Sequence, residues 1–289
     1  MSVIRNESSQ SCGRIFEIFS SFQGEGTLVG RRQIFIRFTG CPLRCSYCDT
    51  PEARNFKAGT EMNVSEVLRC VKALATADLH SISFTGGEPL AQLAFLKEIA
   101  SKTKSEGFKN YIETSGFNAK AFASVADFFD FASIDIKLRN HNAVSHEKYD
   151  ELYGNEIETV RISAKKGLKT IVKVVVLKGT KAEEIERICK DIASFDVDFV
   201  LQPVSPAEQA EQAKQAEQAK QAKQAEQAKQ ARRAEQTEQT EQTEQAGERG
   251  MRRVEPPSIE EIFELSEIAG QFIENVHVIP QMHKILGIS

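Results

Sequence analysis

The sequence lacks any apolar run near the roughly 18 residues that a membrane-spanning helix needs, and its opening stretch MSVIRNESSQ has no apolar signal core. We therefore expect no association with a membrane. Basic residues are not in excess either, since 37 Lys and Arg against 41 Asp and Glu give a formal net charge of −4. This balance argues against direct binding of nucleic acid. Hydrophobic residues make up 40% of the chain, which is enough for a core and excludes a wholly disordered protein.

Cysteine is also scarce, with six residues in a chain of 289. Six cysteines are too few and too clustered for a disulfide scaffold. Three of them, Cys41, Cys45 and Cys48, fall within eight residues, and three neighbouring thiols cannot all pair with one another. A metal centre explains the cluster better. Zinc needs a fourth ligand, and Cys70 and His80 are distant in the sequence. A four-iron cluster held by three cysteines instead leaves one iron open to a substrate or cofactor.

A low-complexity segment interrupts the C-terminal part of the chain. Residues 207–245 are thirteen consecutive triplets, mostly Ala-Glu-Gln or Ala-Lys-Gln. Each triplet turns about 300° around a helix, so the alanines form no stripe that can dock on a core. We expect residues 207–247 to be a solvated helix or a disordered insertion, with a partner-binding arm as the alternative. Residues 1–206 are then the core, and residues 248–289 complete it.

Outside this insertion, strand-like and helix-like segments alternate. The alternation predicts an α/β fold with a parallel sheet covered by helices, either a partial barrel or an open doubly wound sheet. In both folds, ligands collect at the C-terminal ends of the strands. Ser258 suits the N-cap of the last helix. The expected strands are 33–39, 81–85, 111–114, 131–136, 170–177 and 198–202, and the expected helices are 64–74, 90–103, 119–126, 182–193 and 258–272.

Two motifs at strand ends point to one superfamily. The cysteines have CxxxCxxC spacing directly after the strand QIFIRFTG, and the next strand ends in Thr-Gly-Gly-Glu-Pro at residues 85–89. Glycines let the backbone approach a ligand closely, and the helix that follows offers free N–H groups. This pair of motifs resembles the radical S-adenosylmethionine superfamily. The resemblance implies a partial TIM-type barrel and a [4Fe–4S] cluster whose open iron binds S-adenosylmethionine, which is cleaved to a 5′-deoxyadenosyl radical.

Further motifs resemble one family within this superfamily, the 7-carboxy-7-deazaguanine synthases. They are FSSFQGEG at 19–26, CDT at 48–50, ETSG at 113–116, DIK at 135–137, LQPV at 201–204 and VIPQMHK at 278–284. The resemblance implies a lyase that converts 6-carboxy-5,6,7,8-tetrahydropterin into 7-carboxy-7-deazaguanine with release of ammonia, in queuosine biosynthesis. It also implies Mg²⁺, an electron donor such as flavodoxin or ferredoxin, and a homodimer. The reducing requirement of the cluster predicts a cytoplasmic location.

The resemblance also implies roles for individual residues, while no side chain is assigned as a general acid or base. Cys41, Cys45 and Cys48 hold the cluster, and Thr50 ligates magnesium. The implied S-adenosylmethionine contacts are Tyr47, Cys48, Asp49, Gly87, Glu113, Asp135, Ile136, Lys137 and Gln202. The implied substrate contacts are Phe22, Gln23, Gly24, Arg37, Thr85 and Pro280.

Simpler interpretations stay open for some of these residues. Arg37 can be an ordinary strand charge, Thr50 can cap the next helix, and Glu113 can be a solvated strand end. His283 lies in a matching motif without an assigned role. We expect three other histidines to be surface residues and two cysteines to be incidental thiols; these are His141, His146, His277, Cys12 and Cys189.

Two other functions compete with the synthase. One is an activating enzyme that installs a glycyl radical on a partner, because such enzymes also carry CxxxCxxC. The other is a non-catalytic zinc or iron–sulfur module that uses the repeat segment as a scaffold. The second leaves the GGEP, DIK and QPV segments without a purpose.

Overall fold

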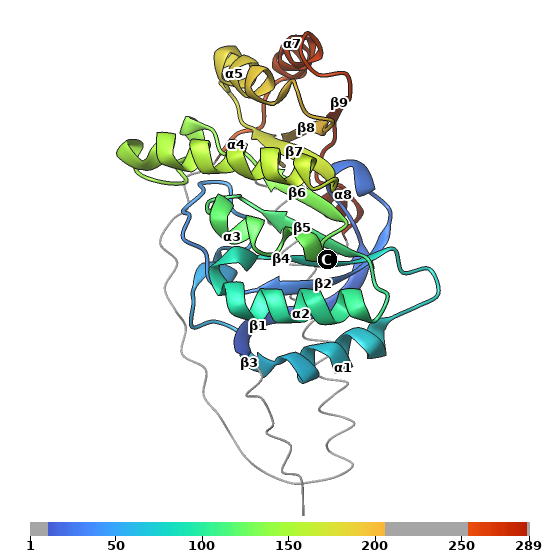
Figure 1. The fold of residues 1–289 in the computed structure, drawn as a ribbon. Coiled ribbons are helices and arrows are strands. Elements are labelled where there is room, and N and C mark those ends of the chain that lie inside the picture. The colour runs from blue at the N-terminus through green and yellow to red at the C-terminus, as the bar shows by residue number, and fades with distance from the viewer. Residues whose placement is uncertain (1–10, 206–253, 288–289) are drawn as a thin grey trace, which may run out of the picture.

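The computed structural model describes residues 11–205 and 254–287, so the predicted insertion at 207–247 lies outside the described residues (Figure 1). The strands are β1 (Cys12–Phe22), β2 (Arg32–Phe38), β3 (Thr60–Asn63), β4 (Ser81–Gly86), β5 (Asn110–Thr114), β6 (Phe131–Asp135), β7 (Lys169–Val176), β8 (Asp198–Pro203) and β9 (Val276–Val278). The helices are α1 (Val64–Leu74), α2 (Leu93–Ser105), α3 (Ala119–Ala123), α4 (Tyr149–Lys165), α5 (Ala182–Ile192), α7 (Ile259–Gly270) and α8 (Met282–Leu286).

All nine of these strands form one sheet in the order β3-β1-β2-β4-β5-β6-β7-β8-β9. From β2 to β9 every neighbouring pair is parallel, whereas β1 is antiparallel to both of its neighbours. The sheet is unclosed, with β3 and β9 at its two edges among the described strands. This architecture confirms the predicted partial barrel. The antiparallel hairpin partner β1, the edge strand β3 and the helix α4 are additions that the strand–helix alternation does not predict.

Helix boundaries follow local signals in the sequence. Asn63 is the N-cap of α1, and its side chain accepts a hydrogen bond from the Glu66 backbone amide at 3.0 Å. In return, the Glu66 side chain accepts a hydrogen bond from the Asn63 backbone amide at 2.8 Å. Ser258 and Glu261 form the same reciprocal box at the start of α7, which confirms the predicted N-cap. No helix within the described ranges is both long and apolar enough to cross a bilayer.

The alternation of side chains along the strands separates two faces of the sheet. Ile82 and Phe84 of β4, and Ile134 of β6, belong to the large apolar core that the helices cover. In Figure 1, helices α1 to α4 lie along one face of the sheet. The alternate residues face the other side, where fewer apolar side chains are buried; they include the cluster of Tyr111, Ile171 and Val200, as well as Phe35 and Val175. Polar residues therefore take the inner face toward the C-terminal ends of the strands; they are Arg37, Thr85, Glu113, Asp135 and Gln202, and Lys173 lies on the same face inside β7.

Candidate active site

The cysteine loop follows β2 directly, and backbone hydrogen bonds hold it from two directions. At its start, the Cys41 amide donates to the Arg54 carbonyl at 3.2 Å. Further along, Arg44 donates to the Ala143 carbonyl at 2.8 Å and Ser46 donates to the His141 carbonyl at 2.9 Å. These contacts place the loop against the segment that follows β6.

All three thiols of this loop are free and partly buried. Cys41 and Cys45 both pack against a small apolar cluster that contains Leu43 and Leu152. Burial raises the pKa of the Cys41 thiol to about 12 and that of the Cys48 thiol to about 11. Buried thiols without a disulfide partner on one short loop fit a metal cluster, because an iron centre takes thiolates and offsets the cost of ionising them.

The Gly86–Gly87 turn after β4 brings the backbone against this loop. Gly86 has φ +122°, and a Cβ atom on Gly87 would lie 2.5 Å from the Gly40 carbonyl oxygen, so neither position accepts a side chain without a shift. Glu88 is fully buried and accepts hydrogen bonds from Thr114 Oγ1 at 2.7 Å and from Ser115 Oγ at 2.5 Å. Burial raises the pKa of Glu88 although these hydrogen bonds oppose the shift. Glu88 therefore fastens the turn to the end of β5.

A series of charged side chains connects the end of β6 with Lys173 inside β7. Lys137 Nζ donates to the Tyr47 hydroxyl at 3.1 Å and lies 3.3 Å from Asp135 Oδ2. Lys173 Nζ lies 3.2 Å from Asp135 Oδ1 and forms a closer ion pair with Glu25. Although burial opposes ionisation, the Lys173 ammonium holds the pKa of Glu25 well below its usual range. This series of contacts links the cysteine loop to residues 23–26, which we call the QGEG loop.

A second network joins three of the predicted site residues. Glu113 accepts hydrogen bonds from Thr85 Oγ1 at 2.6 Å and from Gln23 Nε2 at 2.8 Å. Gln23 Nε2 also donates to Gln33 Oε1 at 3.0 Å, and Gln33 donates in turn to Ser81 Oγ at 2.9 Å. Burial raises the pKa of Glu113 above its usual value. The predicted cofactor residue Glu113 thus lies among two predicted substrate contacts.

The segment before α8 packs on the QGEG loop, although the two are far apart in the sequence. The Met282 amide donates to the Gly24 carbonyl at 2.9 Å, and Gln281 Nε2 donates to Glu25 Oε1 at 2.9 Å. Figure 1 shows α8 beside the loop that follows β1. Glu25, Asp49 and His283 each offer a ligand atom, and these atoms lie within 4.8 Å of one another.

Other predicted residues are placed with different partners. Arg37 is half-buried and donates from Nε to Glu17 Oε1 at 2.7 Å. Gln202 is buried at the end of β8, and its Oε1 accepts no hydrogen bond within the described residues. The side chain of Ile136 lies in the core. Phe22 and Pro280 are exposed.

The expectation that His141 is a surface residue is wrong. Its side chain is fully buried, with Nδ1 accepting from the Leu138 amide at 3.0 Å and Nε2 lying 2.8 Å from the Val175 carbonyl oxygen. Its ring also meets the Tyr47 ring edge-on, with centroids 4.7 Å apart. The partner on β7 is remote in the sequence, so no local pattern shows that the imidazole is needed there. His146 is exposed and His277 is half-buried.

Sequence reasoning missed two buried charged residues, Lys173 and Glu156. Lys173 lies in the run TIVKVVVL, where a lysine in a buried strand signals a buried charge that needs a partner. Glu156 of α4 is fully buried, and both of its carboxylate oxygens lie 3.2 Å from the Lys137 amide nitrogen. Burial raises the pKa of Glu156 well above its usual value.

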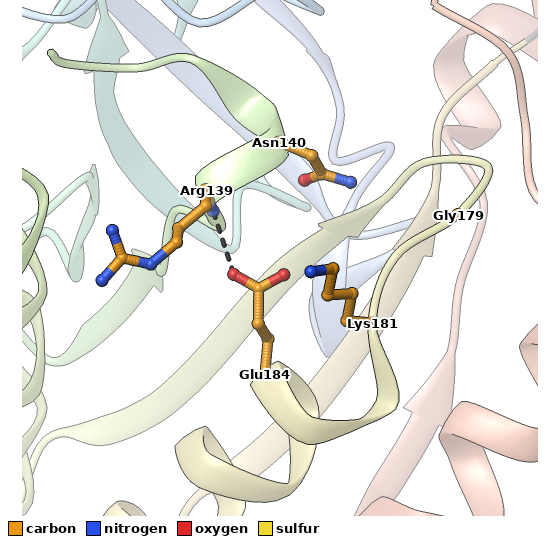
Figure 2. Close-up of a pocket in the computed structure, with 5 residues that line it drawn as sticks. All are labelled: Arg139, Asn140, Gly179, Lys181 and Glu184. Atoms are coloured by element: carbon orange, nitrogen blue, oxygen red, sulfur yellow. Dashed lines mark hydrogen bonds between the residues drawn. The ribbon is translucent and has the colours of Figure 1, made fainter. Parts of the chain in front are cut away.

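A surface pocket of about 270 Å³ lies near the same end of the sheet (Figure 2). Its lining residues are Arg139, Asn140, Gly179, Lys181 and Glu184, and Glu184 Oε1 accepts a hydrogen bond from the Arg139 amide at 3.1 Å. None of the predicted site residues lines it. The candidate site is therefore the set of polar side chains around the cysteine loop and not this pocket.

Comparison with known proteins identifies the class first. The family described as the Radical SAM superfamily matches residues 35–192, a range that contains the cysteine loop, the Gly86–Gly87 turn and the DIK segment. A solved radical SAM methyltransferase from Sphaerobacter thermophilus has the same fold, with a TM-score of 0.56 and 16% identity over 86% of this chain and 66% of that one. The chain is a radical SAM enzyme, and this family implies a [4Fe–4S] cluster and S-adenosylmethionine as cofactors.

Curated relatives narrow the assignment. The chain is 31% identical to the 7-carboxy-7-deazaguanine synthase of Methanocaldococcus jannaschii, over 94% of this chain and 99% of the relative. It is 34% identical to the 7-carboxy-7-deazaguanine synthase of Methanothermobacter thermautotrophicus, over 95% of this chain and 97% of the relative. The chain belongs to the family of 7-carboxy-7-deazaguanine synthases. These relatives favour the synthase over the glycyl-radical activating enzyme.

Proposed function

We propose that the protein converts 6-carboxy-5,6,7,8-tetrahydropterin into 7-carboxy-7-deazaguanine and ammonia, a step in the biosynthesis of queuosine-type bases. One observation carries this proposal beyond family membership. The three free thiols of the cysteine loop lie at the same end of the sheet as the network that joins Gln23, Thr85 and Glu113. This arrangement supports a single site with a cofactor-binding half and a substrate-binding half.

In this proposal, the cofactor half consists of the cysteine loop and the ends of β4, β5, β6 and β8. Cys41, Cys45 and Cys48 would hold the cluster, which supplies the electron that cleaves S-adenosylmethionine and releases a hydrogen-abstracting radical. The buried and unpartnered Gln202 Oε1 fits a ligand that donates a hydrogen bond, such as an adenine amino group. In this proposal, bound S-adenosylmethionine would also contact Tyr47, Asp49, Gly87, Glu113, Asp135, Ile136 and Lys137.

The substrate half would be built on the QGEG loop and the inner face of β2 and β4. Gln23, with its amide oriented by Gln33 and Glu113, would present fixed hydrogen-bonding groups to the pterin ring. Arg37 offers a planar pair of donors for the pterin carboxylate, and it would exchange its Glu17 partner for that group on binding. Phe22, Gly24 and Pro280 complete the proposed contacts.

The proposed function is tested by turnover under anaerobic conditions. Protein reconstituted with iron and sulfide, supplied with a reductant, S-adenosylmethionine and 6-carboxytetrahydropterin, should form 7-carboxy-7-deazaguanine, which chromatography with mass spectrometry detects. Cys45→Ala should lose both the iron–sulfur absorbance and the product. The matched control is Cys70→Ala, because Cys70 lies on α1 away from the cysteine loop and the variant should keep both. A zinc-loaded protein, or 5′-deoxyadenosine without deazaguanine, would contradict the assignment.

We also infer a magnesium requirement at Thr50, where oxygen donors gather. The Thr50 hydroxyl lies 3.3 Å from Asp49 Oδ1, and the Glu25 carboxylate is close to that of Asp49. Hard cations such as Mg²⁺ prefer these ligands. Removing divalent cations with EDTA should lower turnover about tenfold or more without bleaching the cluster, and added Mg²⁺ should restore it. Equal rates in EDTA and in Mg²⁺ would rule the requirement out.

The proposed partners follow from the same chemistry. A radical SAM enzyme requires a reductant, for which a flavodoxin or ferredoxin is suited because each delivers single electrons. We also propose a homodimer, which sedimentation of the reconstituted protein would test. The reducing conditions that the cluster needs favour the cytoplasm.

A further inference from the structure

Lys173 is a buried cation in the middle of the sheet. Strand β7 has the sequence KTIVKVVV, and Lys173 is only 5% exposed there. Its register partner on β6 is Asp135, so both residues project from the inner face of the sheet. Burying an ammonium group is unfavourable unless carboxylates compensate it. A cation at this position therefore depends on its anionic partners.

Those partners come from the two halves of the site. On one side, Lys173 forms its close ion pair with Glu25, the residue after the proposed substrate contacts Gln23 and Gly24. On the other side, Lys173 Nζ lies 3.2 Å from Asp135 Oδ1, in the proposed cofactor segment. The pKa of Lys173 is raised well above its usual value, because these carboxylates outweigh the effect of burial.

Each carboxylate is also held by its own half. Glu25 Oε1 accepts a hydrogen bond from Gln281 at 2.9 Å, and Asp135 Oδ2 lies 3.3 Å from Lys137 Nζ. Lys137 continues to Tyr47 in the cysteine loop. Lys173 is thus a direct link between the two sets of contacts. A weaker link runs through Gln281, whose Nε2 also donates to Asp49 Oδ2 at 3.3 Å.

We propose that Lys173 is a positioning residue that holds Glu25 of the substrate half and Asp135 of the cofactor half in their binding arrangement at the same time. The inference rests on the proposed function and adds a residue to which that function assigns no role. Without the ammonium group, two partly buried carboxylates would face each other, with Lys137 beside Asp135 as the remaining cation. Both would move or take up protons, and both halves would lose their geometry together.

Equilibrium binding tests this by a pattern that does not depend on turnover. Calorimetry on anaerobically reconstituted full-length protein would measure the dissociation constants of S-adenosylmethionine and of 6-carboxypterin separately. Lys173→Met should raise both constants, each about tenfold or more. Glu25→Gln should raise mainly the constant for 6-carboxypterin, and Asp135→Asn mainly that for S-adenosylmethionine.

The matched control is Lys169→Met on the same strand. The Lys169 side chain is 52% exposed and pairs with Asp198 at 2.8 Å, so this variant should leave both constants unchanged. Lys173→Arg keeps the charge but alters its geometry, and it should raise both constants together by a smaller factor. This variant gives the answer if Lys173→Met does not fold, which thermal unfolding would show.

A rise in only one constant, or in neither, for Lys173→Met or Lys173→Arg would overturn the positioning role. If Lys173→Met raised both constants only because the fold is damaged, its melting temperature would fall. The Glu25→Gln and Asp135→Asn variants would then show no selective effect on one constant. If unaltered protein binds S-adenosylmethionine but neither binds 6-carboxypterin nor forms product, the proposed function fails and the inference fails with it. Product formation by unaltered protein combined with a one-sided Lys173 effect would overturn the inference alone.

Discussion

At the scale of single residues, His141 connects the cysteine loop to β7. Its backbone carbonyl holds the cysteine loop at Ser46, its ring packs on Tyr47, and its Nε2 reaches Val175 on β7. Because Nδ1 accepts a hydrogen bond from Leu138, the ring proton lies on Nε2 and the imidazole is neutral. A protonated ring would lose the Leu138 hydrogen bond.

This neutral imidazole predicts a loss of stability in acid. Burial, reinforced by the Lys137 charge, lowers the pKa of His141 to about 3. Between pH 6.5 and that value the unfolded chain binds a proton that the folded chain does not, so acidification favours unfolding by up to about 1.4 kcal/mol per pH unit. Urea unfolding at pH 7, 6 and 5 should show a steeper loss for the unaltered protein than for His141→Gln.

His146→Gln serves as the control for this measurement, because His146 is exposed. Its stability should follow that of the unaltered protein at each pH, since the exposed side chain of His146 contributes little to the packing of the fold. Parallel stability curves for the unaltered protein and His141→Gln would contradict a buried neutral histidine.

The inner-face residues at strand ends are the part of the site that can be predicted from sequence. Thr85, Glu113 and Asp135 each end an apolar strand, and parallel pairing brings such ends to one edge. Lys173 is not at a strand end, so the same reasoning overlooks it. The partner of His141 is 34 residues away, and only the folded sheet brings the two together.

At the scale of elements, the QGEG loop depends on the segment that leads into α8. Gly24 packs so closely there that a Cβ atom would lie 2.6 Å from His283 Cβ and 2.7 Å from the His283 backbone nitrogen. Because backbone is among the atoms met, a side chain at position 24 would displace the whole segment. The position requires glycine for its size.

Gly24→Ala should therefore weaken substrate binding more than it weakens the fold. We expect a rise of about tenfold in the dissociation constant for 6-carboxypterin, because Gln281 and His283 move away from Glu25. Calorimetry would measure this, and hydrogen exchange would show faster exchange in residues 279–286.

Gly154→Ala is the matched control, since a Cβ there would meet no described atom within 4 Å beyond its own stretch of helix. Gly154 lies inside α4, where alanine should stabilise the helix by about 0.5–1 kcal/mol without affecting binding. Unchanged binding in Gly24→Ala would show that the segment tolerates the displacement.

Some helices and strands form from local sequence patterns, and others depend on contacts between distant segments. The predicted range of α1 matches the structure, since apolar spacing and the Asn63–Glu66 box are local. By contrast, β1 pairs with both β2 and β3 in antiparallel fashion, without the helical crossovers that connect the parallel strands. Antiparallel pairing at the edge of a parallel sheet depends on tertiary contacts, so the alternation of strands and helices in the sequence does not predict it.

At the scale of the whole molecule, the two described ends of the chain that flank residues 206–253 meet at one strand end. The Val204 amide donates to the Val176 carbonyl at 3.0 Å, and the Lys178 amide donates to the Glu255 carbonyl at 3.0 Å. Val204 and Val254 also share one small apolar cluster. The fold therefore fixes both attachment points independently of what connects them.

Replacing residues 207–247 by a short Gly-Ser linker should leave the enzyme intact. The melting temperature should change by no more than about 2 °C, because the linker closes a short gap and loop entropy changes slowly with length. Iron content and the rate of product formation should be unchanged. A truncated protein that folds but loses activity would show that the repeat segment has a functional role.

The contact between Gly24 and Met282 also has a consequence for biosynthesis on the ribosome. Glu25 and Gln281 are 256 positions apart, and at about 5–20 residues per second the second follows the first by roughly 10–50 s. During that interval the emerging polypeptide has its cysteines but not the segment that closes over the QGEG loop. Translation therefore delays completion of the site until the segment around Gln281 has been made.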